Sequence, residues 1–148
     1  MIALKLVRLI EANSQELSRG LMEKILSSER TSDYRKVPEM EMRNAVVDIY
    51  QHLSDWLLTK TDSDIELRYT RLGELRGRQG VSPSHFVWAI VLTKEHLWGF
   101  LQREAFAEHA VELFGELELL RSLDCFFDHA VYYAMLGLER ARKEAKAA

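Results

Sequence analysis

The sequence predicts an all-α protein that folds as one domain over residues 1–148. The chain contains only two prolines and seven glycines, so few positions interrupt a helix. Its apolar residues recur at steps of three and four instead of alternating, which is the pattern of helices with a buried face. A length of 148 residues is typical of a single domain. We therefore expect a helical bundle with long C-terminal helices.

The first part of the chain is predicted to form two helices. Apolar periodicity indicates one helix over residues 2–12 and a second over about 15–28. Asn13 and Ser14 lie between them and offer side-chain oxygens that cap free backbone amides. The polar stretch 28–33 then interrupts the helical pattern.

The middle of the chain contains two more predicted helices. Pro38 suits the first turn of a helix that runs to about Lys60. Residues 61–64, Thr-Asp-Ser-Asp, form a connection rich in capping residues. The helix that follows is expected to extend to Gln79 and to stop at Gly80.

The last part of the chain is the most helical. Ser82 followed by Pro83 is typical of a cap and a first helical residue, and the helix they begin ends near Glu104. Residues 106–146 are apolar and helix-forming. They predict either one long helix or two helices joined near Gly115.

Two charged residues occupy apolar helix faces. At about 100° per residue, Ile65, Tyr69 and Leu72 share one face, and the next position on it is Arg76. Asp124 lies within an apolar stripe of the final helix, which consists of Leu113, Leu117, Leu120, Phe127, Val131 and Leu138. Burying either charge alone is costly. We therefore expect Arg76 to pair with Asp124 or to receive an anionic head group. In the alternative, Arg76 reaches the surface along its aliphatic stem.

Two predicted helices are apolar on a second side as well. In the helix that begins at Pro83, the first stripe consists of Phe86, Ile90, Leu97 and Leu101. Its second stripe consists of Val87, Val91 and Trp98. The second stripe of the final helix consists of Leu119, Phe126, Tyr133 and Gly137. One domain of this size rarely buries two helices completely, so we expect the second stripes to form a four-helix homodimer contact. In the alternative, the N-terminal helices cover them.

Composition argues against several functions. The net charge of -3 and pI near 6.0 give no general attraction to nucleic acid or to an anionic membrane. Lys94 and Glu95 interrupt the most apolar stretch before it reaches the length of a membrane span. The single cysteine, Cys125, cannot form an internal disulfide, and the N-terminus lacks a complete signal peptide. We therefore expect a cytoplasmic protein.

The sequence contains no set of residues that is typical of an enzyme or a metal centre. Cys125 and His129 lie four residues apart on one helix face, but two ligands do not complete a tetrahedral metal site. Glu108, His109 and Glu112 match part of a di-iron set, yet no second Glu-x-x-His accompanies them. We therefore predict no enzymatic activity and no bound metal.

The segment 74–83, Glu-Leu-Arg-Gly-Arg-Gln-Gly-Val-Ser-Pro, precedes an aromatic-rich helix. It resembles the passage between the F and G helices of globin-type bacterial sensors. In haem-binding members, a histidine four residues before the glycine ligates iron, and Arg76 stands at that position here. This difference points to the haem-less, globin-like N-terminal domains of RsbR-type stressosome co-antagonists. Residues 9–17 and 126–131 are similar to the same family.

The resemblance implies a globin-like, haem-less and non-enzymatic input or regulatory module of bacterial stress signalling. Such modules sense through an internal pocket or through their dimer surface and pass their signal to an attached output module or to a protein partner. No output module follows Ala148, so we expect either a free-standing sensor or a piece of a longer protein. Haem binding through His52 or His96 is a third, weaker interpretation, since no proximal histidine accompanies them.

Some haem-less relatives hold a fatty acid in place of haem. For such a ligand, Arg76 is expected to meet the carboxylate. The other candidate ligand residues are Asp124, Tyr69, Leu72, Phe86, Ile90, Leu120 and Phe127. The alternative is a core filled by side chains, in which case the chain is a helical protein-interaction adaptor without a ligand.

Overall fold

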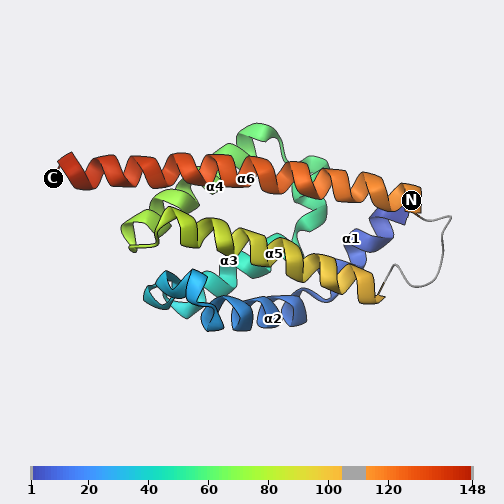
Figure 1. Ribbon diagram of the computed structural model, residues 1–148. Coiled ribbons are helices and arrows are strands. Elements are labelled where there is room, and N and C mark those ends of the chain that lie inside the picture. The colour runs from blue at the N-terminus through green and yellow to red at the C-terminus, as the bar shows by residue number, and fades with distance from the viewer. Residues whose placement is uncertain (1, 105–112, 148) are drawn as a thin grey trace.

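The computed structural model describes residues 2–104 and 113–147, and every regular element in these ranges is a helix. The elements are α1 (Ile2–Ala12), α2 (Ser14–Ser27), the 3-10 helix η1 (Glu29–Lys36), α3 (Glu39–Gln51), the π-helix η2 (Asp55–Thr59), α4 (Asp62–Arg78), α5 (Pro83–Glu104) and α6 (Leu113–Ala147) (Figure 1). The predicted all-α bundle with a long C-terminal helix is confirmed, since α6 continues through Gly115 over 35 residues. In Figure 1, α5 lies between α2 and α6.

The predicted helix from Pro38 to Lys60 is not one continuous α-helix, although the chain stays helical to Thr59 apart from a turn at His52. The α-helix α3 ends at Gln51, and a π-helical turn, η2, follows it. Glu11 of α1 accepts hydrogen bonds from the backbone N–H of Ser54 at 3.2 Å and from its hydroxyl at 2.9 Å. A carboxylate that binds a backbone N–H competes with the helical hydrogen bond of that group. The long-range contact with α1 therefore accompanies the change of helix type, and Trp56 is buried just after it.

The local stop and start signals of the sequence are confirmed. Thr61 and Asp64 form a reciprocal capping box at the start of α4, in which the Thr61 N–H donates to Asp64 Oδ2 at 2.8 Å. Gly80 follows the end of α4 with a φ of 87°, a backbone conformation that favours glycine. Pro83 is the first residue of α5.

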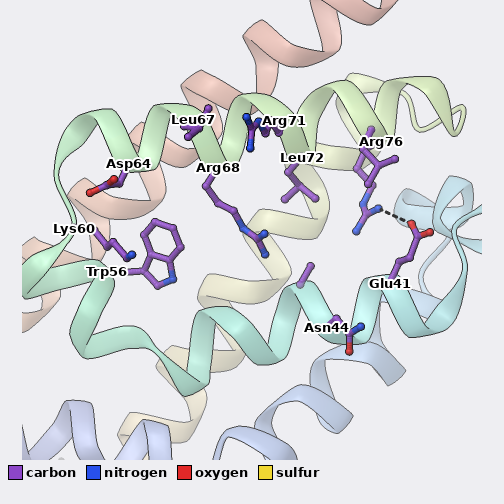
Figure 2. A pocket seen from close by; sticks show the side chains of 12 residues that line it. Glu41, Asn44, Trp56, Lys60, Asp64, Leu67, Arg68, Arg71, Leu72 and Arg76 are labelled. Carbon is purple, nitrogen blue, oxygen red and sulfur yellow. Dashed lines mark ion pairs between the residues drawn. The ribbon is translucent and has the colours of Figure 1, made fainter.

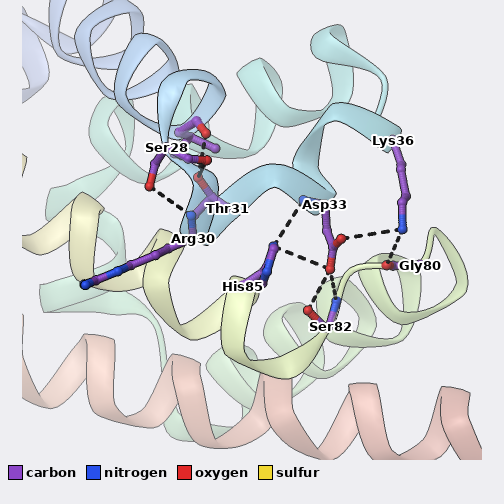
Figure 3. A network of polar contacts seen from close by, with 9 residues as sticks. Ser28, Arg30, Thr31, Asp33, Lys36, Gly80, Ser82 and His85 are labelled. Carbon is purple, nitrogen blue, oxygen red and sulfur yellow. Dashed lines mark hydrogen bonds and ion pairs between the residues drawn. The ribbon is translucent and has the colours of Figure 1, made fainter.

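A polar network joins η1 to the first turn of α5 (Figure 3). One carboxylate oxygen of Asp33 accepts hydrogen bonds from the Ser82 hydroxyl at 2.6 Å and from the Ser82 backbone N–H at 2.9 Å. The Asp33 N–H donates to Nδ1 of His85 at 3.1 Å. Lys36 lies 3.5 Å from the other Asp33 oxygen. The sequence predicted only a polar break here, whereas in the structure this segment is joined to the start of α5 by hydrogen bonds.

Helices α4 and α6 pack with their backbones unusually close together. A Cβ atom added to Gly73 would overlap the carbonyl group of Ala134, and one added to Gly137 would overlap the Thr70 carbonyl oxygen. Gly77 faces the Ala141 side chain in the same way. Small residues at a helix contact let two helices approach more closely than branched side chains would permit. Helix α4 therefore packs against α6 along most of the length of α4.

The prediction of which face of α6 is buried was partly wrong. Among the residues of α6 whose side chains the structure describes, the buried ones are Leu123, Phe126, Phe127, Ala130, Ala134, Gly137, Leu138 and Ala141. Asp124 lies to the side of this face, is exposed and forms an ion pair with Lys94 at 3.3 Å. The side chains of Leu113, Leu117 and Leu120 lie outside the described residues. The true face has small residues at several positions, so its hydrophobicity is weak in the sequence.

The predicted dimer stripe on α6 is partly used inside the chain. Phe126 is only 3 % exposed, and Gly137 touches the backbone of α4. Tyr133 is half-buried, and its hydroxyl donates to Asp62 at 2.7 Å. These contacts exclude Phe126 and Gly137 from a surface, which corrects the prediction for α6, while the Leu119 side chain lies outside the described residues. On α5, the outer stripe differs: Val87 and Trp98 are exposed, and Val91 is half-buried.

Candidate functional site

Arg76 is buried in the last turn of α4, as its helix face predicted. The residue is 3 % exposed, and Ile65 and Tyr69 of the same face are also buried. Its Nη1 donates to Oε1 of Gln79 at 2.9 Å and lies 3.8 Å from Oε2 of Glu41. The pairing of Arg76 with Asp124 was therefore wrong, because the guanidinium turns toward α3 and away from α6. The alternative of an exposed guanidinium was also wrong.

The polar partners of Arg76 form a small closed set. Gln79 accepts from Arg76 and donates through its Nε2 to Oε2 of Glu41 at 2.8 Å. Burial lowers the pKa of Arg76, Tyr34 and Glu41 raise it, and the nearby cation Arg68 lowers it again. A guanidinium stays protonated through such shifts. The fold thus keeps a full positive charge just beneath the surface.

A small cavity of about 50 Å³ lies on the inner side of Arg76. Four of the predicted ligand residues line it together: Leu72, Arg76, Phe86 and Ile90. Its other lining residues are Ile25, Tyr34, Met42, Ala45, Val46, Ile49, Ala89 and Thr93. One water occupies about 30 Å³ of liquid, and small-molecule sites measure about 300–1,000 Å³. The cavity is therefore of solvent size.

The remaining predicted ligand residues lie elsewhere. Tyr69 belongs to an aromatic cluster, where its ring centroid lies 5.8 Å from that of Trp56 and 5.7 Å from that of Phe126. Phe127 packs on Phe126 at 5.3 Å. Asp124 is at the surface with Lys94, and the Leu120 side chain lies outside the described residues. None of these described side chains borders the 50 Å³ cavity.

An open groove of about 510 Å³ lies on the outer side of Arg76 (Figure 2). It runs between α3, η2 and α4, and three side chains, Ala45, Leu72 and Arg76, border both this groove and the inner cavity. They form a partition one side chain thick. The groove is also lined by Glu41, Asn44, Trp56, Lys60, Asp64, Leu67, Arg68, Arg71 and Leu75. The sequence did not predict it.

The groove carries more positive than negative charge. Its cations are Lys60, Arg68, Arg71 and Arg76, and its carboxylates are Glu41 and Asp64. Both carboxylates already accept hydrogen bonds, Glu41 from Gln79 and Asp64 from the Thr61 backbone N–H. The Thr61 contacts, first from its backbone and then from its side chain, lower the pKa of Asp64. The lining of the groove therefore has a net positive formal charge.

Residues 15–148 match the family model of the RsbT co-antagonist protein rsbRD N-terminal domain. The chain belongs to this family. The match covers most of the sequence and confirms the resemblance to RsbR-type stressosome co-antagonists. Membership makes the chain a regulatory module of stress-response signalling, of a type that works in complexes with protein partners. No curated protein and no solved structure matched the chain significantly.

Among the described residues, no histidine is a hydrogen-bond or ion-pair partner of Arg76. His52 caps α3 and lies 3.9 Å from Asp55, at the surface. His96 is half-buried and its ring packs against Gly20 of α2. His129 contacts Asp62 at 2.6 Å. Within the described ranges, no group of three metal-ligating side chains occurs, while Glu108, His109 and Glu112 lie outside those ranges.

Sequence reasoning missed the residues that make the groove of this rsbRD-type domain. Arg68 and Arg71 look like the solvated face of α4, and Lys60 looks like part of a connection. Their common feature is visible only when α3 and η2 pack beside α4. A weak signal was present, because three arginines, Arg68, Arg71 and Arg76, fall on neighbouring turns of one helix.

Among the described residues, no helix is long and apolar enough to cross a membrane.

Proposed function

We propose that this chain is a non-enzymatic, haem-less and dimeric regulatory module of stress signalling, with a globin-like arrangement and a core filled by side chains. Family membership supports the signalling role. The single observation that favours a filled core is the volume of the inner cavity, about 50 Å³. An acyl chain or a haem group needs several times that space. Regulation then works through the outer surface, where a partner or ligand binds.

The residues around the cavity support the haem-less interpretation. Arg76 stands where haem-binding relatives of this fold carry the iron-ligating histidine, and a guanidinium is no iron ligand. No histidine borders the inner cavity within the described residues. His52 and His96 each lie against other elements. These residues do not fit a haem group.

A second candidate is an input module that holds a small apolar anion, such as a fatty acid, within its core. It is favoured by the meeting of Leu72, Arg76, Phe86 and Ile90 at one cavity, with a cation at its edge. Such a ligand requires a wider cavity, because the present one holds only about one or two waters by volume. The two candidates therefore differ in whether the core opens.

Native mass spectrometry of the gently purified protein, followed by denaturation and solvent extraction, tests both candidates. We expect a dimer mass with no stoichiometric small molecule in the core. A bound acyl chain that is lost in the cavity-filling variant Ala89→Val, but kept in Ala145→Val at an exposed position of α6, would favour the fatty-acid candidate. A monomer would contradict the dimeric part of the proposal.

Haemin titration tests the haem-less part separately. We expect only the broad, weak absorbance of non-specifically bound haemin, with the same spectrum for the wild type and for His52→Ala and His96→Ala. A sharp, saturable Soret band that one of these substitutions removes would contradict the proposal.

A further inference from the structure

The groove between α3, η2 and α4 is lined by two guanidinium groups that come from different turns of α4. Arg68 and Arg76 are two turns apart on α4, and both side chains point into the space between α4 and α3 (Figure 2). Each has a carboxylate on α3, Asp48 at 3.3 Å from Arg68 and Glu41 at 3.8 Å from Arg76. Two like charges that face one groove repel each other, and an anion between them removes that repulsion.

Arg76 has donor groups to spare. A guanidinium carries five N–H donors. The described residues give Arg76 one hydrogen bond, to Gln79, and one longer ion pair, to Glu41. Its side chain is fixed by burial on the inner side, so little conformational freedom is lost when an anion binds. Arg76 is therefore a preorganised donor at the groove floor.

The other cations of the groove leave charge for a ligand. Arg71 has no carboxylate within ion-pair distance among the described residues. Lys60 lies over the Trp56 ring at 5.7 Å from its centroid. Because the groove is lined by four cations and two carboxylates, an anionic ligand meets mainly positive partners.

Apolar surface lies next to these charges. Leu67 is 54 % exposed and Leu75 is 38 % exposed, and both line the groove on α4. Leu72 and Trp56 form the adjacent apolar part of the groove wall. Large exposed apolar side chains beside cations indicate a ligand with an apolar body and an anionic head. The volume of about 510 Å³ lies in the range of small-molecule sites.

We propose that this outer groove binds a carboxylate or phosphate group carried on an apolar body, with the anionic head between Arg68 and Arg76 and the body along Leu72 and Trp56. The site is about ten times larger than the inner cavity, about 510 Å³ against about 50 Å³. The inference rests on the proposed function, since it names the ligand class that such a regulatory module receives.

Four octyl probes of the same chain length test the site: octanoate, octyl phosphate, octanol and octyltrimethylammonium, each below its micelle concentration. Binding is measured by isothermal titration calorimetry and by amide chemical shifts of the full chain. We expect saturable binding of one or both anions, with shifts along α3 and α4, and no comparable binding of the alcohol or the cation. The relative affinities of octanoate and octyl phosphate show which head group the site prefers.

Three variants locate the head group. Arg68→Met and Arg76→Met should each weaken anion binding by about tenfold or more, as expected for the loss of a charge-assisted hydrogen bond. Arg78→Met is the matched control, because Arg78 lies on the same helix, pairs with Glu74 and Glu144 and does not line the groove. Arg68 is partly exposed, so its variant remains informative if Arg76→Met folds poorly.

Several results would overturn the inference. Equal binding of octanol and octanoate would make the groove a purely apolar site. No anion binding at any accessible concentration would leave the charges without this role. Loss of binding in Arg76→Met together with full binding in Arg68→Met would place the anion in the inner cavity.

The site and the function fail separately. A dimer that binds no anion keeps the proposed function and loses this site. A chain that binds the anions but is a monomer with haem bound keeps the site and loses the proposed function.

Discussion

Asp33 holds two segments together with one carboxylate. Its oxygen accepts both polar hydrogens of Ser82, at the cap of α5, while its backbone N–H reaches His85 one turn later. Hydrogen bonds from the Ser82 side chain and then its backbone lower the pKa of Asp33 from 3.8 to about 2, and His85 and Lys36 act in the same direction. Because the folded pKa lies below the unfolded one, the charged carboxylate stabilises the native state.

This pKa shift predicts a pH-dependent effect of Asp33→Asn. The contribution is fully present above about pH 4 and is lost as the pH falls through about 2. We expect Asp33→Asn to lower the free energy of unfolding by about 1–2 kcal/mol at pH 7. The difference from the wild type should be much smaller at pH 2.5 than at pH 7 and should vanish only below about pH 2. Urea unfolding at pH 7, 4 and 2.5 measures it.

Asp128→Asn is the control for this experiment, because Asp128 is exposed on α6. It should leave stability within about 0.5 kcal/mol of the wild type. A loss in Asp33→Asn that stays constant from pH 7 to pH 2.5 would show that the network acts through shape and not through charge.

At the scale of elements, the contact between α4 and α6 depends on small residues. Gly73 and Gly137 each lie where a methyl group would meet the backbone of the opposite helix. Neither residue is there for backbone freedom, because the described non-cap glycines of these helices have negative φ. The helices themselves would be more stable with alanine. The glycines therefore lower the intrinsic stability of each helix but permit the two helices to pack closely.

Alanine substitutions at this contact should destabilise the protein. We expect Gly73→Ala and Gly137→Ala each to lower the free energy of unfolding by about 1–3 kcal/mol, because the added methyl forces the helices apart. Gly99→Ala in α5 is the matched control, since the nearest atom to its added Cβ is the flexible end of Arg103, at 3.3 Å. It should leave stability unchanged or raise it by up to about 1 kcal/mol. Thermal and urea unfolding provide the comparison, and equal effects at all three positions would contradict the close contact.

The same elements show what sequence can predict. The capping box at Thr61, the turn at Gly80 and the start at Pro83 were predictable, because each signal is contained in a few neighbouring residues. The buried position of Arg76 also followed from helical periodicity.

The failures have a physical cause in common. The buried face of α6 contains Ala130, Ala134 and Gly137, whose small side chains give periodicity little to detect. The partners of Arg76 come from Gln79 nearby and from Glu41 on another helix, and the π-helix η2 accompanies a contact with Glu11. Such contacts depend on how distant segments pack together, and no short stretch of the sequence specifies that packing.

At the scale of the whole molecule, α5 presents the remaining candidate for an interface between copies. Val87 is 38 % exposed, and Trp98 and the half-buried Val91 lie on the same side of the helix. The proposed dimer therefore uses α5 without the buried residues of α6. The small residues of the longest helix, α6, instead pack against α4.

A charge on this side of α5 should disrupt the dimer. We expect Val87→Glu to shift the protein from dimer to monomer in analytical ultracentrifugation, because a carboxylate would be desolvated in the contact. Leu58→Glu provides the comparison, since Leu58 is equally apolar and strongly exposed on η2. It should leave the oligomeric state unchanged. A Val87→Glu variant that remains dimeric would place the contact on another surface.

The partition formed by Ala45, Leu72 and Arg76 separates groove from cavity by the thickness of a side chain. One layer of side chains therefore belongs to two spaces, so a change of side-chain volume at Ala45 or Leu72 alters the groove and the cavity together.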